Sequence, residues 1–555
     1  MLDCLLLMIP KLVVDAPTVG PPLLKAYLTR NGFTAKVIDY NIALFNNVND
    51  SAGKEIAQEA WFKNNNHWAF GPEPGFVSLY DNHLAPFVQQ YAKDCVNENA
   101  NWIGISVFSY ISLGITWKFI EEIKKIKSDQ KIVLGGPGAT TYKEHVKKFI
   151  EPDSIILGDA DDAIVSLLKG EPISDEFYYI KDFKNMPYPD YSDMDWSLYH
   201  KRNEAKKMHD FPIIGKDRKN YSKWGKINIT GSRGCVRACT FCDIKHIWPK
   251  FTYRPGKDIA GEMIYLNEEY GFAYFTFTDS LINGSLKAFR EICTEVKKVK
   301  EEENKNISWG GQFICRSYKQ MPEELWADMR DSGLKYINIG IESGSESVRN
   351  HMKKKFSNED MYYTFDMASK YNISTTYNLI IGYPTETEED FNDTLSLIKH
   401  VSILNKDIKE ESKHSIGNFD TLAITSNIDL VTPEMIEELG LINAIGEGRL
   451  EHWEIKNQPE GLPYNQAIRL RRLITVLALL NETEHKVTGS YAIRKSPRDK
   501  TISRCIGHGC GWNPKTSGTL GLLLRRELPR MLNKYKELTG ENLNTSELLE
   551  ARKHY

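Results

Sequence analysis

The chain has 555 residues, which is long enough for three or four domains of ordinary size. Hydrophobic residues make up 41% and charged residues 26%, a composition of folded rather than disordered proteins. Lys and Arg number 71 against 74 Asp and Glu, so the formal net charge of −3 argues against a generally basic nucleic-acid-binding protein.

The first 175 residues alternate short apolar runs with helical patterns, which predicts a parallel α/β sheet. The expected strands are Cys4–Ile9, Ala35–Ile38, Trp102–Phe108, Lys131–Leu134 and Ser154–Leu157. The expected helices are Pro22–Asn31, Thr116–Lys127, Tyr142–Phe149 and Asp161–Leu168. Asp3 stands where a signal peptide would carry a basic residue, and no run of about 18 apolar residues predicts a membrane span.

Two glycine-rich turns, Gly135–Thr140 and Gly158–Asp161, each follow an expected strand and precede a helix. Ligands of doubly wound sheets lie beyond the carboxyl ends of the strands, and glycine lets backbone amides approach them closely. Tight strand-to-helix turns use glycine for steric reasons too. The residues alone therefore leave both interpretations open.

Two less regular segments follow. Asn46–Ala100 is rich in Asn and aromatic residues, and we expect it to pack against the neighbouring domain. Asn185–Asp193 is a connector marked by Pro and Asp. Beyond it, residues 194–224 carry many Lys and Arg, which we interpret as a solvated crossing loop rather than a nucleic-acid patch.

Cys235, Cys239 and Cys242 form a C-x3-C-x2-C motif. Random placement of nine cysteines would give this spacing roughly 0.002 times per chain. Three thiolates suit a soft metal centre with one open coordination position. A structural zinc site usually has four ligands in paired C-x2-C knuckles, and the sequence has no second knuckle nearby. The motif therefore favours an iron–sulfur cluster.

From Lys226 onward, strand, loop and helix patterns repeat in order, which predicts a βα barrel with its chemistry on the loops after the strands. The expected strands are Ile227–Thr230, Phe272–Thr278, Ile307–Trp309, Tyr336–Ile341 and Thr375–Ile381. The expected helices include Pro322–Ser332, Asn358–Tyr371 and Glu388–Asn405. The cysteine motif follows the first of these strands directly.

Phe241 completes a C-x3-C-x-φ-C signature with an aromatic φ, and here the chain resembles the radical S-adenosylmethionine (SAM) enzymes. The resemblance implies that the three thiolates hold a [4Fe–4S] cluster whose fourth iron chelates SAM. It also implies reductive cleavage of SAM to a 5′-deoxyadenosyl radical.

The resemblance extends to the later strand ends. The turn at Asp279 resembles the motif for the SAM amino group, and Glu342 and its neighbours resemble the motif for the ribose and carboxylate. Lys354 lies near the basic position for the SAM carboxylate, although three adjacent lysines leave the choice open, and the backbone at Gly382 would lie along adenine. The implied SAM contacts are Phe241, Asp279, Ser280, Gly310, Gly311, Glu342, Ser343, Lys354, Ile381 and Gly382. Without the resemblance, Glu342 would be an ordinary acid at a helix start.

The segments Val19–Gly32, Val37–Asp39, Ile103–Ser106 and Val133–Thr140 look like the cobalamin-binding domain that precedes many radical SAM domains. The implied cobalamin contacts are Ser106, Gly135, Gly136, Gly138, Thr140 and Gly158. Two departures stand out. The D-x-H-x-x-G motif is missing, so no His is offered as the lower axial ligand, and Gly138 stands where relatives often have His.

In the carboxyl-terminal region, the sequence predicts helices at Pro433–Leu439, Asn465–Leu480 and Leu520–Leu538, the last interrupted at Pro529. Cys505, His508 and Cys510 could ligate a metal or relay a radical. Their spacing lacks a partner pair, so we favour a glycine-rich loop with free thiols.

We therefore expect an α/β protein with a Rossmann-like cobalamin-binding domain (1–180), a linker (181–224), a partial (β/α)6 radical SAM barrel (225–405) and a mostly helical substrate or cap region (406–555). The expected function is cobalamin-dependent radical SAM chemistry, with methylation of an unactivated carbon as the leading reaction. Cyclisation, rearrangement and a non-catalytic sensor are the alternatives. A methylthiotransferase is disfavoured, because its three-cysteine amino-terminal domain is not evident. The expected partners are a flavodoxin- or ferredoxin-type electron donor and a small-molecule or peptide substrate, in a reducing cytoplasm.

Overall fold

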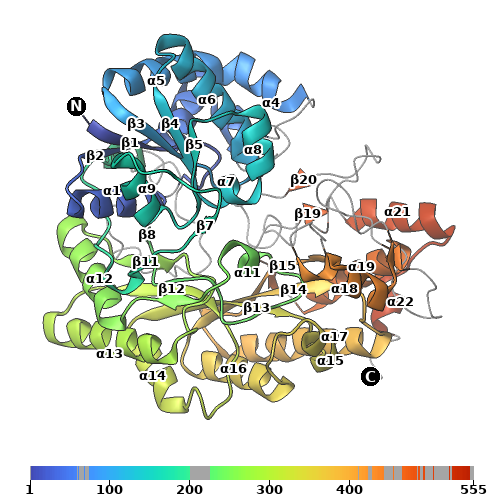
Figure 1. Cartoon of the computed structure of the whole chain (residues 1–555). Helices are drawn as coiled ribbons and strands as arrows, with labels where there is room; N and C mark the ends of the chain where they lie inside the picture. The colour runs from blue at the N-terminus through green and yellow to red at the C-terminus, as the bar shows by residue number, and fades with distance from the viewer. Residues whose placement is uncertain are drawn as a thin grey trace. The chain divides into compact units, whose positions relative to one another are not determined.

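The protein was analysed as a computed structural model (Figure 1). It describes residues 2–14, 16–58, 60–61, 68, 74–199, 226–409, 412–422, 428–442, 454–455, 466–483, 485–487, 492–493, 504–505, 524 and 528–550. The chain divides into two compact units. The first holds the described residues up to Tyr199 with 226–230 and 252–276, and the second holds Gly231–Phe251 and the described residues from Phe277 onward.

The first unit is built on a five-stranded sheet in the order β2-β1-β3-β4-β5. Its strands are β1 (Leu2–Met8), β2 (Ala35–Asp39), β3 (Ala100–Ser106), β4 (Lys131–Gly135) and β5 (Ser154–Ile155). All four pairings are parallel, and Leu6 of β1 lies beside Val37 on one side and Gly104 on the other. The apolar run of β1 is buried from Cys4 onward, as a strand covered on both faces requires. The predicted Rossmann-like sheet is confirmed.

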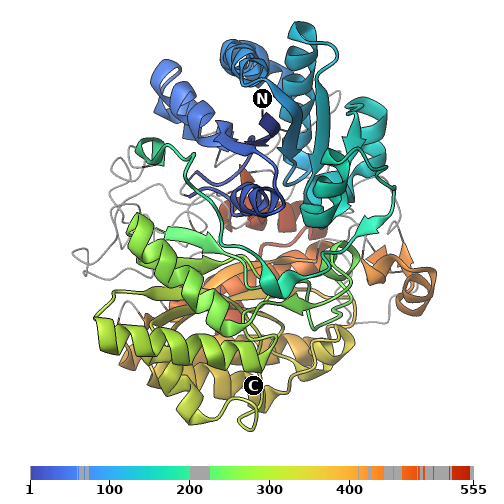
Figure 2. The ribbon, with the colours of Figure 1, turned by 60° about the vertical axis from the view of Figure 1, so that its left-hand side comes forward.

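Helices cover both faces of this sheet (Figures 1 and 2). Helices α1 (Gly20–Arg30) and α9 (Ala160–Leu168) lie on one face, and α5 (Ala85–Asn97) and α6 (Leu113–Ile126) lie on the other. The smaller elements are α2 (Tyr40–Ser51), α3 (Lys54–Gln58), α4 (Pro74–Leu79), η3 (Tyr80–Leu84), η4 (Tyr110–Ser112), α7 (Pro137–Thr141), α8 (Lys143–Phe149), β6 (Leu157–Gly158), β7 (Phe177–Tyr178) and η5 (Phe183–Asn185).

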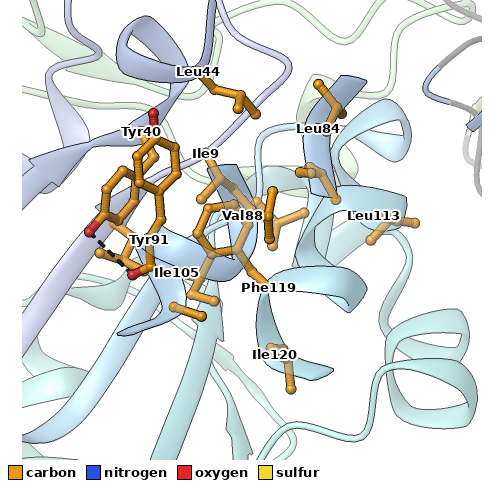
Figure 3. Packing of buried hydrophobic residues seen from close by; sticks show 14 of the residues in the cluster. Ile9, Tyr40, Leu44, Leu84, Val88, Tyr91, Ile105, Leu113, Phe119 and Ile120 are labelled. Carbon is orange, nitrogen blue, oxygen red and sulfur yellow. Dashed lines mark hydrogen bonds between the residues drawn. The ribbon is translucent and has the colours of Figure 1, made fainter. Parts of the chain in front are cut away.

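The segment Asn46–Ala100 differs from its prediction, because much of it is helical. Trp61 and Trp68 meet edge to face at 5.0 Å and belong to the core of their own unit, so the expectation of packing on the next domain is wrong for them. In the same core, Tyr40 stacks on Tyr91 at 4.3 Å (Figure 3). Tyr91 lies on the amphipathic helix α5, whose buried side belongs to this core. Phe70 lies outside the described residues.

The connector Asn185–Asp193 is fixed to the first unit by ion pairs. Lys25 Nζ on α1 lies 2.6 Å from Asp193 and 3.2 Å from Asp190. Asp193 also accepts a 3.0 Å hydrogen bond from the amide of Val37. The basic residues at 201–219 lie outside the described residues. The domain boundaries stay predictions.

The second sheet has seven strands in the order β18-β15-β14-β13-β12-β11-β8. They are β8 (Lys226–Ile229), β11 (Tyr274–Phe277), β12 (Ser308–Phe313), β13 (Leu334–Glu342), β14 (Ser374–Ile381), β15 (Ser415–Thr421) and β18 (Lys486–Val487). The pairings from β12 to β18 are parallel. Among the described strands, β8 and β18 are the two edges of the sheet and do not pair with each other. The predicted partial barrel is therefore confirmed as an open one.

In the second unit, helices α13 (Leu286–Glu303), α14 (Glu323–Asp331), α16 (Asn358–Lys370) and α17 (Glu388–Asp407) lie along one face of the sheet (Figure 1). Ser357 and Thr387 begin α16 and α17 with capping boxes, which satisfy the free amides of the first turn. The other described elements of the second unit are β9 (Ser232–Arg233), α11 (Ile244–Ile247), α15 (Glu346–His351), η8 (Asp429–Val431), α18 (Pro433–Leu439), β16 (Leu441–Ile442), β17 (Glu454–Ile455), α19 (Gln466–Glu482), β19 (Ala492–Ile493), β20 (Arg504–Cys505), α21 (Leu528–Thr539) and α22 (Thr545–Glu550). Strand β10 (Thr252–Tyr253) and helix α12 (Gly256–Tyr270) belong to the first unit.

Three details differ from the sequence expectations. Strand β12 continues through its glycines to Phe313, and β15 was not expected. Helix α21 begins at Leu528, so Pro529 stands in its first turn, where proline is tolerated, and does not interrupt a longer described helix. Within the described part of the chain, no helix is long and apolar enough to cross a membrane.

Candidate active site

The loop Gly231–Asp243, called the cysteine loop below, follows β8. Asp279, placed after β11, fixes the start of this loop. One carboxylate oxygen accepts the Gly231 amide at 2.8 Å, and the other accepts the Ser232 hydroxyl at 2.7 Å. Gly234 has a φ of +78°, and a Cβ there would lie 2.4 Å from the carbonyl oxygen of Lys250. Only glycine permits this turn. Asp279 therefore orients the cysteine loop, whatever else it contacts.

The cysteine loop presents three free thiols, with Cys239 buried and Cys235 and Cys242 half-buried. Burial raises the pKa of all three thiols, that of Cys242 to about 11, while the positive charge of Lys354 works against the rise at Cys235 and Cys239. Over the part of the chain that the structure describes, no group of three His, Cys, Asp or Glu side chains is arranged to hold a metal ion. A cluster is several atoms wide, so its ligands need not converge on one point. The metal ligands stay predictions.

Lys354 stands out among the three adjacent lysines. Lys353 and Lys355 are exposed, whereas Lys354 is 8% exposed. Its Nζ lies 3.2 Å from Oε1 of Glu342 and 5.6 Å from the centre of the Phe241 ring. Burial disfavours the charge of this ammonium, but the carboxylate of Glu342 together with the nearby Cys239 and Cys315 outweighs burial and raises the pKa of Lys354. A fixed cation thus lies beside the cysteine loop, where it can pair with a carboxylate.

Glu342 ends β13 in a left-handed conformation, with a φ of +69°. Gly340 leaves room for the ion pair, because a Cβ there would lie 2.5 Å from Glu342 Oε1 and 3.0 Å from Lys354 Nζ. The buried hydroxyl of Ser343 accepts the amide of Ser345 at 3.1 Å, so it stabilises the turn that follows. A left-handed backbone at a polar residue such as Glu342 is typical of functional sites.

Gly382 and the residues up to Thr387, called the Gly382 loop below, follow β14. Gly382 has a φ of +73°, and its amide donates to the buried carboxylate of Glu386. Arg472 on α19 lies 3.1 Å from the same carboxylate oxygen, and Arg469 packs over Gly382, with Cγ 2.8 Å from where a Cβ would stand. Burial raises the pKa of Glu386 to about 7 against the opposing charge of Arg472. Ile381 is buried beside the loop.

The glycines of β12 have a packing role in the structure. A Cβ on Gly310 would lie 2.2 Å from the ring of Tyr336, and one on Gly311 would lie 2.7 Å from Ile282. Ser280 is half-buried after β11. The SAM contacts of these three residues stay predictions.

The glycine turns of the first unit are equally tight. A Cβ on Gly138 would lie 2.7 Å from the amide nitrogen of Ser109, and one on Gly158 would lie 2.4 Å from the ring of Phe177. The Thr140 hydroxyl accepts the amide of Gly158 at 3.0 Å and donates to Gly136 at 3.1 Å. Gly138 therefore has no room for the His that relatives often carry, so this turn offers no imidazole to cobalt.

The same edge of the first sheet carries features that the sequence analysis missed. Ser106 ends β3 and is half-buried, and a Cβ on Gly136 would lie 3.5 Å from its hydroxyl. Three residues later, the buried Ser109 hydroxyl has no partner among the described residues. Phe108 is 56% exposed, and Val13, which follows β1, is 55% exposed. An unpartnered hydroxyl and exposed apolar groups on the loops at this edge suit a ligand with both apolar and polar surface. None of Ser109, Phe108 and Val13 has a signal in the sequence.

A family model described as "Radical SAM superfamily" matches residues 229–398. The chain contains a radical SAM domain. The match begins at the end of β8, includes the cysteine loop, Lys354 and the Gly382 loop, and ends within α17.

Curated relatives of this chain include a putative methylthiotransferase of Methanocaldococcus jannaschii, 24% identical over 300 residues, which covers 52% of this chain and 63% of the relative. A tRNA-2-methylthio-N(6)-dimethylallyladenosine synthase of Acetivibrio thermocellus is 28% identical over 184 residues, which is 31% of this chain and 37% of the relative. The chain thus spans less than two thirds of the length of either relative.

Two solved structures share the fold. The radical SAM methyltransferase TsrM from Kitasatospora setae, with cobalamin and a [4Fe–4S] cluster bound, is 15% identical with a TM-score of 0.55, covering 81% of this chain and 82% of that one. The cobalamin-dependent SAM radical enzyme OxsB, with aqua-cobalamin and SAM bound, is 13% identical with a TM-score of 0.61, covering 99% and 78%. The likeness extends well beyond residues 229–398, so the fold of the cobalamin-dependent radical SAM enzymes is present.

Proposed function

We propose that this protein is a cobalamin-dependent radical SAM enzyme. The observation that carries the proposal is the cysteine loop at the end of β8 with the buried Lys354–Glu342 pair beside it. Under this proposal, the three soft ligands and the fixed cation would meet the methionine end of SAM. The family match and the shared fold support the same assignment.

Cys235, Cys239 and Cys242 would hold the cluster, which when reduced supplies the electron that breaks the C5′–S bond of SAM into methionine and a 5′-deoxyadenosyl radical. Lys354 would bind the SAM carboxylate and Glu342 the ribose. Asp279 holds the cysteine loop through two hydrogen bonds. The radical would then take a hydrogen atom from a carbon of the substrate and leave as 5′-deoxyadenosine.

The first unit would bind cobalamin at the carboxyl edge of its sheet, and there cobalamin would supply a methyl carrier. Ser109 would donate a hydrogen bond, and Phe108 and Val13 would cover an apolar face of the ring. The tight packing at Gly138 supports binding without an imidazole from that turn. Methylation of an unactivated carbon is our leading reaction, and cyclisation or rearrangement is an alternative outcome of the same radical.

Methylthio transfer is the second candidate, because the curated relatives carry that name. That reaction uses three further cysteines before the barrel. This chain has only Cys4 and Cys95 there, and both are buried. Burial raises the pKa of each thiol to about 12, so neither is disposed to ligate iron. We therefore favour carbon methylation.

An electron donor of the flavodoxin or ferredoxin type is the proposed redox partner, and a small molecule or peptide is the proposed substrate. All seven cysteines with described surroundings are free, which supports a reducing cytoplasm as the setting. The side chain of Cys505, together with His508 and Cys510, lies outside the described part of the chain, so their role stays open to the same assays.

Anaerobic reconstitution with iron and sulfide tests the proposal. We expect 5′-deoxyadenosine to form from SAM under dithionite, and the purified protein to show a cobalamin absorption spectrum. A loaded cluster without SAM cleavage would favour a non-catalytic sensor. Cleavage without bound cobalamin would retain the radical SAM assignment and remove the methyl carrier.

A further inference from the structure

Thr240 lies between two of the three cysteines of the motif and is completely buried. Its amide donates to the carbonyl of Met352 at 3.2 Å, and its carbonyl accepts the amide of Leu430 at 3.2 Å. Its hydroxyl lies 3.0 Å from the phenol oxygen of Tyr383. Every hydrogen-bonding group of Thr240 is thus used, and each ties the cysteine loop to a different segment of the second unit.

Tyr383 immediately follows Gly382 and is also completely buried. Besides Thr240, its hydroxyl meets Nδ1 of His351 at 3.0 Å. Burial raises the pKa of Tyr383 well above its ordinary value, so the phenol stays protonated. The side chain of Tyr383, a residue of the Gly382 loop, is therefore hydrogen-bonded to the cysteine loop.

The partners decide the direction of these bonds. The carboxylate of Glu438 lies 3.6 Å from Nε2 of His351, and a carboxylate can only accept. This favours the tautomer with hydrogen on Nε2, which leaves Nδ1 to accept from Tyr383. The phenol oxygen can then accept from Thr240, so both ends of the Tyr383 hydroxyl are satisfied.

The bonds lie in a dry environment. Phe241 of the cysteine loop packs against a buried cluster that contains Tyr383, Met352 and Leu430. A hydrogen bond in such surroundings is stronger than one in water, and removal of one partner leaves the other buried and unpaired. The series of hydrogen bonds from His351 through Tyr383 to Thr240 can therefore fix the position of the cysteine loop.

We propose that Tyr383 is a positioning residue that fixes the cysteine loop relative to the Gly382 loop by acting through Thr240. The inference rests on the proposed function, in which the cysteine loop meets the methionine end of SAM and the Gly382 loop meets adenine. A single phenol would then set the distance between the two halves of the SAM site. Correct alignment of the bond to be broken depends on such fixed distances.

The test uses the full chain with Tyr383→Phe, compared with Tyr377→Phe as a matched control. Tyr377 is equally buried, and its hydroxyl bonds His485 at 3.1 Å instead of the cysteine loop. In the reconstituted protein we expect Tyr383→Phe to retain its iron. We expect about tenfold weaker SAM binding and a weaker SAM-induced change in the electron paramagnetic resonance of the reduced cluster. Tyr377→Phe should retain both signals.

Variants of Thr240 test whether Tyr383 acts through its hydrogen bond to Thr240. Thr240→Val should reproduce the effect of Tyr383→Phe, and Thr240→Ser should restore SAM binding because it keeps the hydroxyl. The double variant Tyr383→Phe/Thr240→Val should be no weaker than the weaker single variant, since residues that act through one bond are not additive. Additive losses, or normal SAM binding by Tyr383→Phe, would overturn the proposal.

A second readout needs no cofactor. In the cluster-free protein, amide hydrogen exchange of the cysteine loop should be faster in Tyr383→Phe than in wild type, and unchanged in Tyr377→Phe. Equal exchange in both variants would refute the positioning role. If the loaded wild-type protein bound no SAM while this exchange difference persisted, the proposed function would fail and the link between the loops would stand.

Discussion

Nζ of Lys354 lies 3.2 Å from Oε1 of Glu342, and the two side chains are 10% and 12% exposed. The pair joins the end of β13 to a short turn after α15, both beside the cysteine loop. A buried ion pair gives little net stability, because desolvation offsets the attraction. Under the proposed function, the pair would hold a cation in place before SAM arrives.

Replacement of that cation should weaken SAM binding. Lys354→Met removes a charge-assisted hydrogen bond to the SAM carboxylate, worth about 1.5–3 kcal/mol, so the Kd for SAM should rise about 10- to 100-fold. Titration calorimetry on the reconstituted protein measures it. Lys355→Met, which changes an exposed neighbour, is the control. Equal affinities of the two variants would mean that another group binds the carboxylate.

Removal of one partner of the buried Arg472–Glu386 pair should destabilise the Gly382 loop. Arg472→Met leaves the Glu386 carboxylate buried and unpaired, which should cost about 3–5 kcal/mol of unfolding free energy at pH 8. Because burial raises the pKa of Glu386 to about 7, the loss should shrink as the pH falls below 7 and the carboxyl becomes neutral. Denaturant unfolding at several pH values checks this, with the exposed Arg471→Met as control. A loss that does not depend on pH would point to packing instead of charge.

Ser109 should matter for cobalamin and not for folding. Its buried hydroxyl has no described partner, so Ser109→Ala should leave the thermal midpoint unchanged or slightly raised, and should weaken cobalamin binding about fivefold or more. Absorption titration with cobalamin measures the affinity. Ser112→Ala provides the contrast, because that buried hydroxyl accepts the amide of Lys11 at 3.3 Å and its loss should destabilise the fold. A destabilised Ser109→Ala with normal cobalamin affinity would reverse the assignment.

Two buried histidines should make the second unit sensitive to acid. Burial lowers the pKa of His414 to about 3 and that of His485 to about 4, below the ordinary value of 6.5. The unfolded chain therefore binds more protons, and stability should fall as the pH drops from 6.5 towards 4. His485→Gln should make this fall shallower in thermal unfolding. Tyr377→Phe removes the hydrogen bond to His485 and keeps the imidazole, so it should lower stability by about 1 kcal/mol without making the fall shallower.

Much of the fold could be predicted from the sequence, because the alternation of apolar strands and amphipathic helices is a local signal. The apolar run of β1 and the capping residues of α16 and α17 are examples. Strand β15 escaped prediction, since Ser415–Thr421 has no apolar alternation, and its pairing with β14 and β18 is visible only in the structure. The same holds for β12, whose two glycines interrupt a strand pattern yet pack closely, Gly310 against Tyr336 and Gly311 against Ile282.

The site shows the same limit. The cysteines and the run of three lysines are visible in the sequence, but only the fold distinguishes Lys354 from its neighbours, by burying it next to Glu342. Asp279 was expected to meet SAM, and the structure adds a role in holding Gly231 and Ser232. The bonds of Thr240 and Tyr383 join positions 143 residues apart, and no local pattern announces them.

The central claim is reductive cleavage of SAM at the cysteine loop. The most direct measurement is 5′-deoxyadenosine formed from SAM under dithionite by the anaerobically reconstituted protein, with Cys239→Ala as the comparison. We predict one or more equivalents of 5′-deoxyadenosine per wild-type chain and none above background for the variant. Formation by both proteins, or by neither despite a full complement of iron in the wild type, would contradict the claim.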